Sequence, residues 1–187
     1  MKLIRNFFFL IFILGTVVLL IMCGYQIYEK MSNPLEYKEQ VESCSLKYNV
    51  EEALIYAVIK TESNFKPQAV SSAGAKGLMQ ITPETFKWLQ KKRGVKGLEE
   101  SDLFDPNVNI EYGVYFISLL IKIYDDEKVA LSAYNAGMGN VDKWLSNSEY
   151  SQDAKTLTVI PYKETDNYVK KVLRHREIYK NLYFKNQ

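Results

Sequence analysis

The sequence predicts an all-α fold, made of one helical domain behind a single N-terminal membrane-spanning helix. An uncharged apolar run covers residues 7–23, and apolar side chains recur at helical spacing through most of the remaining chain. No segment has the alternating pattern of a β-strand, and no stretch repeats another. The 187 residues are enough for one domain of ordinary size plus this appendage.

The N-terminal run is long enough to cross a membrane. Together with Gly24 and Tyr25 it approaches the roughly 20 residues that a spanning helix needs. A cleaved signal peptide would have a shorter apolar region of about 7–15 residues and an Ala-x-Ala-like cleavage site, which is lacking here. Cys23 could carry a lipid anchor, but it follows Met22 instead of a small residue. The pattern therefore favours an uncleaved signal anchor.

The charges before this run predict its orientation. Lys2 and Arg5 place the N-terminus in the cytoplasm, because positive residues stay on that side. We expect a cytoplasmic tail over residues 1–6 and a transmembrane anchor over residues 7–25. A juxtamembrane connector over residues 26–32 would then lead to a folded domain over residues 33–187. This gives a single-pass protein of the cell membrane with its domain on the extracytoplasmic side.

Capping residues and prolines mark the starts of the first helices of the domain. Asn33 is expected as an N-cap, with Pro34 at the first helical position. Asn49 is expected to open the next helix, where Glu52 completes a capping-box-like pair. Thr82, followed by a proline, opens the helix after that by the same signal.

Later helices are predicted from their apolar spacing. Asp105 and Pro106 open a largely buried helix, whose apolar positions run from residue 108 to residue 124. A shorter helix follows over residues 129–134, and a long amphipathic helix over residues 161–183 ends the domain. The segment between these last two is polar and is expected to be a loop.

Glu62 ends an apolar, helix-like run over residues 54–59. The helix dipole disfavours negative charge at a C-terminal end, and apolar neighbours raise the pKa of a carboxyl group. Both effects keep a proton on the group, as a general acid requires. On this stretch alone, a helix-terminal glutamate that reaches solvent is the simpler interpretation.

Composition excludes several classes of function. The net charge is +2 and no dense basic block occurs, which argues against a nucleic-acid partner. Cys23 lies in the apolar run, so it does not form a disulfide framework with Cys44. His175 is the single histidine, which excludes a multi-histidine metal site, and we expect it on the solvent face of the last helix. No metal and no cofactor is expected.

Four short blocks follow one another in the chain. They are Glu-Ser at residues 62–63, Gly-Leu-Met-Gln at 77–80, Ala-Tyr-Asn-Ala-Gly at 133–137, and Glu-Thr at 164–165 followed by Tyr168. In this order they resemble the lytic transglycosylase family with the goose-lysozyme-like catalytic domain. The resemblance runs from about Val41 to about Tyr183. It implies a lysozyme-like helical catalytic domain within residues 33–187.

The resemblance implies that Glu62 is the catalytic acid of a peptidoglycan lytic transglycosylase. Other residues of the same segments would bind the substrate: Ser71, Met79, Gln80, Tyr134, Asn135, Glu164 and Tyr168. The substrate would be a peptidoglycan glycan strand, cut at the β-1,4 bond between N-acetylmuramic acid and N-acetylglucosamine to leave a 1,6-anhydromuramic end. A single acid suits this reaction, because the C6 hydroxyl of the muramic acid acts in place of an activated water.

Two other functions stay open on the sequence. A goose-type lysozyme would use the same Glu62 with water as the acceptor. A non-catalytic peptidoglycan-binding module of a membrane assembly would be marked by loss of Glu62, which is present. An anchored wall-opening enzyme would suit an envelope-spanning or wall-remodelling assembly, although no motif names such a partner.

Overall fold

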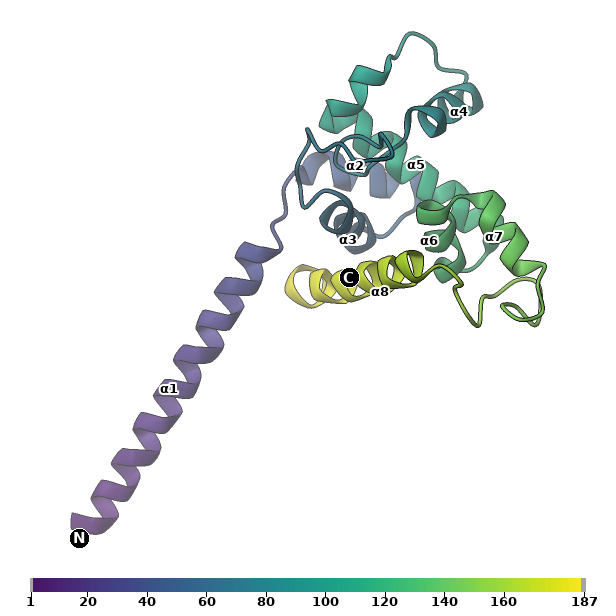
Figure 1. The fold of residues 1–187 in the computed structure, drawn as a ribbon. Coiled ribbons are helices and arrows are strands. Elements are labelled where there is room, and N and C mark those ends of the chain that lie inside the picture. Colours follow the sequence, from purple (N-terminus) through teal and green to yellow (C-terminus); the bar gives the residue numbers. More distant parts are fainter. Residues whose placement is uncertain (1, 186–187) are drawn as a thin grey trace. The chain divides into compact units, whose positions relative to one another are not determined.

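The computed structural model describes residues 2–185, and within them the prediction of an all-α fold is confirmed. The described residues form no strand, only the isolated bridges of Lys76 with Val70 and Ile81. The helices are α1 Lys2–Ser32, α2 Lys38–Tyr48, α3 Glu52–Glu62, α4 Pro83–Arg93, the 3₁₀ helix η1 Glu100–Phe104, α5 Pro106–Tyr124, α6 Glu127–Ala136, α7 Met138–Leu145 and α8 Lys163–Tyr183 (Figure 1). The chain divides into two compact units, Met1–Leu35 and Glu36–Gln187.

The first unit is the helix α1 with a short extension. Of the described residues, only this helix is long and apolar enough to cross a membrane, over Ile4–Ser32. The segment expected as a connector, residues 26–32, continues the same helix. Asn33 does not start a helix, so its predicted N-cap role is wrong. Its backbone N–H and its side-chain amide both donate to the carbonyl of Glu29, each at 2.9 Å, and thereby close the C-terminal end of α1.

The boundary between α2 and α3 also differs from the expectation. Asn49 adopts the left-handed conformation, with φ of 53°, and its N–H donates to the Ser45 carbonyl at the end of α2. The N-cap of α3 is Glu51, whose side chain makes no capping bond to the helix. Asparagine tolerates this conformation better than most residues, so here it ends one helix instead of opening the next. The predicted capping-box pair of Asn49 and Glu52 is therefore wrong.

The two proline-marked helix starts are confirmed. Thr82 Oγ1 accepts a hydrogen bond from the Thr85 N–H at 3.2 Å, with Pro83 as the first residue of α4. Asp105 Oδ1 accepts from the Asn107 N–H at 2.7 Å, with Pro106 as the first residue of α5. Proline fits the first helical position because its missing N–H would have no intrahelical partner there.

The helix α3 forms the centre of the second unit. All its residues from Ala53 to Ile59 are at most 2% exposed, so the helix is surrounded by protein on every face over two turns. It packs mainly against α8, while α5 packs against α2 and α6 (Figure 1). Leu46 of α2 is 80% exposed and does not belong to the buried face that the apolar pattern suggested.

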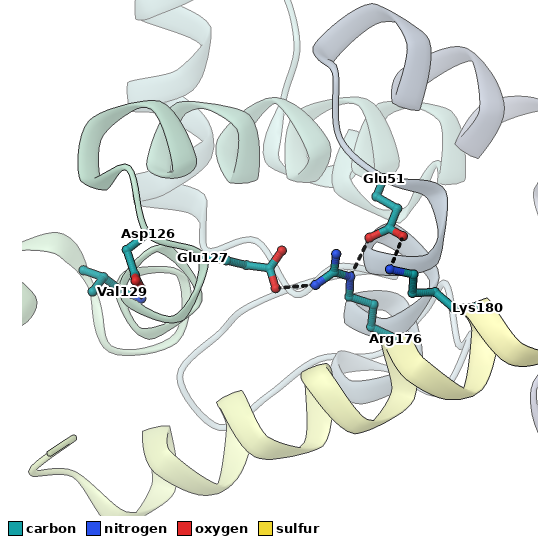
Figure 2. A network of polar contacts seen from close by, with 6 residues as sticks. All are labelled: Glu51, Asp126, Glu127, Val129, Arg176 and Lys180. Carbon is teal, nitrogen blue, oxygen red and sulfur yellow. Dashed lines mark hydrogen bonds and ion pairs between the residues drawn. The ribbon is translucent and has the colours of Figure 1, made fainter. Parts of the chain in front are cut away.

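One arginine of α8 joins three helices of this unit. The Arg176 guanidinium lies between the carboxylates of Glu51 and Glu127 and bonds to both (Figure 2). Lys180 adds a second contact to Glu51 at 3.2 Å. Since Glu51 precedes α3 and Glu127 is the first residue of α6, this network fixes α8 against both helices.

Candidate active site

Glu62 is the last residue of the buried helix α3, and the chain turns away directly after it. Asn64 and Phe65 both have positive φ, of 50° and 63°, so the helix cannot continue beyond them. Buried Ser63 donates its hydroxyl proton to the Leu78 carbonyl at 2.8 Å. This bond ties the end of α3 to the Gly-Leu-Met-Gln segment.

That segment is held from its other side by Asn109 of α5, which is fully buried. Asn109 Oδ1 accepts from the Met79 N–H at 2.7 Å, and Nδ2 donates to the carbonyls of Lys76 and Leu103 at 2.9 and 2.7 Å. A Cβ atom on Gly77 would come within 2.2 Å of Asn109 Nδ2, so only glycine allows this approach. The loop is therefore fixed relative to both α3 and α5.

The Glu62 side chain opens into a pocket of about 260 Å³. Its lining comes from the end of α3, the small-residue loop, the end of α6 and the start of α8: Glu62, Ser71, Ser72, Ala73, Ala75, Gln80, Thr82, Tyr134, Asn135 and Glu164. The structure thus brings Glu62 together with five of the seven residues that the resemblance marked as substrate-binding. The four sequence blocks meet at one place.

The other two marked residues lie behind the pocket. Met79 is fully buried, and a Cβ atom on Gly113 would come within 2.3 Å of its sulfur, so its side chain packs tightly against α5. Only its carbonyl contributes, by accepting the Tyr134 hydroxyl at 2.7 Å. Tyr168 is 7% exposed, and its hydroxyl interacts with the Glu62 carboxyl group.

Burial raises the pKa of Glu62 to about 7. The carboxylate would be favoured by solvation, and the surrounding protein removes most of that solvation. The interaction with the Tyr168 hydroxyl acts in the opposite direction and offsets part of the rise. Glu62 therefore carries a proton for part of the time at neutral pH, as the sequence predicted for a general acid.

Comparison with known proteins assigns the domain. Residues 39–157 match the family model of the Transglycosylase SLT domain, which is more than half of the chain. The chain belongs to this family. The match covers the first three blocks of the SLT domain and stops before the Glu-Thr block on α8.

Several relatives share the SLT domain. The soluble lytic murein transglycosylase of Escherichia coli is 33% identical over 150 residues, which are 79% of this chain and 23% of that protein. The membrane-bound lytic murein transglycosylase C of Shigella sonnei is 37% identical over 124 residues, 61% of this chain and 34% of that protein. The chain therefore spans about a quarter to a third of the length of these relatives.

Two solved structures have the same helical arrangement. A lytic transglycosylase Slt of Pseudomonas aeruginosa, an inactive glutamate-to-glutamine mutant, has a TM-score of 0.73 at 29% identity and covers 84% of this chain and 26% of its own. The 70-kDa soluble lytic transglycosylase of Escherichia coli has a TM-score of 0.73 at 28% identity and covers 85% and 26%. The lysozyme-like helical fold implied by the sequence blocks is thereby confirmed.

Hydrogen bonds inside the SLT domain determine what its pocket can offer a ligand. Both bonds of the Gln80 amide nitrogen go to loop carbonyls, those of Ala69 and Gly77, so its Oε1 is left to accept. Asn135 Oδ1 accepts from buried Thr165 at 2.8 Å, which leaves its NH₂ group as a donor. Because the single Tyr134 proton goes to the Met79 carbonyl, this hydroxyl can only accept from a ligand.

His175 differs from its expected place on the solvent face. It is half-buried, and its Nδ1 lies 3.0 Å from Oγ1 of Thr61, the residue before Glu62. The Thr61 hydroxyl proton already goes to the Ala57 carbonyl at 2.7 Å, so Nδ1 carries the hydrogen of this contact. Burial, and then the nearby charge of Lys60, lower the pKa of His175. It helps to hold the end of α3 in place.

Sequence reasoning missed Ser63, Asn109 and His175 as supports of the site. Ser63 lies inside a recognised block, but its role depends on a carbonyl fifteen residues away. Asn109 is a polar residue among the apolar positions of a buried helix, and that was the available signal. None of the three lines the pocket.

Proposed function

We propose that this SLT domain is a lytic transglycosylase of peptidoglycan. It would cut the β-1,4 bond between N-acetylmuramic acid and N-acetylglucosamine and leave a 1,6-anhydromuramic end. The observation that carries the proposal is Glu62, a carboxyl group with its pKa raised to about 7 at the wall of a pocket. The names of the relatives, lytic murein transglycosylases, support the same reaction and substrate.

In the first step Glu62 acts as a general acid. Its proton moves to the glycosidic oxygen while the bond from that oxygen to C1 of the muramic acid breaks. A carboxyl group with its pKa near 7 is protonated often enough at neutral pH to donate, and the carboxylate left behind is close to the cationic C1. Asn135, through its free NH₂ group, and the acceptors Gln80 and Tyr134 would orient the sugars.

In the second step the same group acts as a base. The Glu62 carboxylate takes the proton of the muramic C6 hydroxyl as that oxygen bonds to C1. The proton given in the first step is thereby regained, and no water is consumed. Glu164 is the only other carboxylate in the pocket lining, and it is exposed, so one buried acid serves both steps.

The mass of the products separates this reaction from that of a lysozyme. Hydrolysis adds one water to each cut, whereas transglycosylation adds nothing. The full chain in detergent should release anhydro-ended muropeptides from purified sacculi, detected by mass spectrometry. Hydrated ends alone would show a goose-type lysozyme, and no release would leave a binding module.

Glu62→Gln tests the assignment of the acid. The substitution keeps the shape of the side chain but removes the proton that titrates, so the rate should fall by about 10²–10⁴-fold while glycan binding persists. The solved Pseudomonas aeruginosa relative is described as an inactive mutant of the same kind, glutamate to glutamine. Glu177→Gln on the exposed face of α8 is the matched control and should keep wild-type activity. Near-normal activity of Glu62→Gln would exclude Glu62 as the acid.

The N-terminal helix supports a membrane location for this enzyme. A membrane-bound relative exists, and the apolar helix Ile4–Ser32 fits an anchor. The proposed topology is single-pass, with residues 1–6 in the cytoplasm and the domain from residue 33 onward outside. The peptidoglycan strands are the proposed partner, within an envelope-spanning or wall-remodelling assembly. The reaction is proposed to need no metal, cofactor or nucleic acid.

A further inference from the structure

A second pocket adjoins the one that contains Glu62. Its volume is about 540 Å³, and its lining residues are Asn135, Ala136, Pro161, Tyr162, Lys163, Glu164 and Thr165. Asn135 and Glu164 line both pockets, so a ligand seated at Glu62 can extend into this side pocket without crossing a wall. The mechanism proposed above makes no use of this side pocket.

An exposed aromatic ring forms part of the side pocket. Tyr162 is 51% exposed, although the edge of its ring packs against Trp144, with ring centroids 4.9 Å apart and planes at 76°. Trp144 is itself only 6% exposed and therefore belongs to the core. A large apolar face held in one place yet open to solvent offers a platform for ligand groups at little cost in conformational entropy.

A cation lies next to this ring. Lys163 is exposed, and the described residues provide it with no ion-pair partner, whereas Lys170 on the same helix pairs with Asp166 at 2.6 Å. The neighbouring Glu164 can accept hydrogen bonds from amide N–H groups. The side pocket thus combines an aromatic face, a cation and an acceptor, which together match a short peptide that carries carboxylates.

We propose that the side pocket binds the peptide branch of the glycan strand, with Lys163 paired to a carboxylate of that peptide. This inference rests on the proposed function, because a peptidoglycan strand in the Glu62 pocket is what brings a peptide branch to the adjoining space. The SLT domain then distinguishes peptide-bearing strands from bare ones through residues that take no part in bond cleavage.

Binding of two strand preparations tests this assignment. Soluble peptidoglycan strands are compared with the same strands after an amidase has removed their peptides. Binding is measured with the full chain in detergent, in the Glu62→Gln background, so that the result does not depend on turnover. Peptide-bearing strands should bind more tightly, and Lys163→Gln should reduce that preference by about two- to fivefold, as expected for an exposed ion pair. Lys163→Glu should reduce it further.

Control variants separate this effect from a general change of charge. Lys170→Glu changes the charge of α8 equally but lies outside both pockets, so it should leave the preference unchanged. Tyr162→Ala should lower affinity for peptide-bearing strands alone. Equal loss on both preparations would overturn the proposal. So would tighter binding of bare strands that depends on Lys163, since the amidase exposes the lactyl carboxylate of the sugar.

The same experiment keeps the two proposals apart. If the wild-type chain binds peptide-bearing strands preferentially but releases no anhydro-muropeptides, the proposed reaction fails and the peptide site stands. If anhydro-muropeptides are released and the Lys163 variants keep the wild-type preference, the peptide site fails and the reaction stands.

Discussion

At the scale of single residues, the protonation of Glu62 links activity to stability. The pKa of Glu62 is about 7 in the folded protein and near 4.5 in an unfolded chain. Between these two pH values the folded state binds more protons than the unfolded state, so the free energy of unfolding decreases as the pH rises. A buried carboxylate that destabilises the fold above pH 7 is the cost of having an acid that works at neutral pH.

Glu62→Gln should therefore be more stable than the wild type at high pH. The gain in unfolding free energy should be close to zero near pH 4.5 and grow to at most about 3 kcal/mol above pH 7, because each pKa unit corresponds to about 1.4 kcal/mol. Thermal unfolding at several pH values, followed by tryptophan fluorescence, measures this difference. Trp88 and Trp144 are the only tryptophans and both lie in the second unit. A stability difference that stays constant with pH would mean that Glu62 has an ordinary pKa.

The wild-type activity should show the same titration. Since the free enzyme must enter the cycle protonated at Glu62, kcat/KM should fall as the pH rises through about 7. His175 titrates as well, but burial lowers its pKa, so its protonation belongs to a more acidic range. A His175→Gln variant should keep the alkaline fall in kcat/KM, and loss of that fall would assign it to the histidine.

At the scale of elements, the catalytic helix depends on a side chain that touches no ligand. Asn109 of α5 satisfies three backbone groups of the neighbouring loops. Asn109→Ala leaves those groups buried without partners, so we expect a loss of about 3 kcal/mol or more in unfolding free energy. Asn107→Ala is the control on the same helix, because Asn107 is exposed and its side chain bonds only to Asp105. Equal stability of the two variants would show that Asn109 is not a support.

The network around Arg176 belongs to the same scale. Arg176→Met leaves Glu51 and Glu127, both only partly exposed, without their shared cation. The unfolding free energy should fall by about 1–2 kcal/mol, more than for an exposed ion pair, because the carboxylates are partly desolvated. Arg174→Met on the exposed side of α8 should cost much less. An Arg176 variant as stable as the Arg174 control would remove the network from the forces that hold α8.

Elements were predictable from the sequence where one local signal sufficed. Thr82 and Asp105, each before a proline, capped helices as expected, because a proline can only follow an N-cap in that position. Asn33 and Asn49 were assigned to the wrong helices, since an asparagine fits either end of a helix and only the tertiary structure decides. Ser63 and Asn109 could not be assigned at all, because their partners lie far away in the chain.

At the scale of the whole molecule, the prediction concerns the N-terminus. If α1 is a retained anchor, the protein extracted from membranes should begin at Met1, and a protease added outside intact cells should reach only the domain. N-terminal sequencing and protection experiments measure these two properties. Replacement of Lys2 and Arg5 by glutamine should weaken the orientation, whereas the same change at Lys30 after the span should have little effect. A mature start near Cys23 would show a cleaved or lipidated form.

The short join between the two units limits where such an enzyme can work. Only residues 33–37 separate the end of α1 from the start of α2, and five residues span at most about 18 Å. For an anchored chain this length acts as a leash, and the enzyme's radius of action is set by the leash and not by diffusion. A freely diffusing relative samples the entire wall, but the leashed one meets only the strands above its own point of insertion. Lengthening the join would enlarge the hole that one molecule can open.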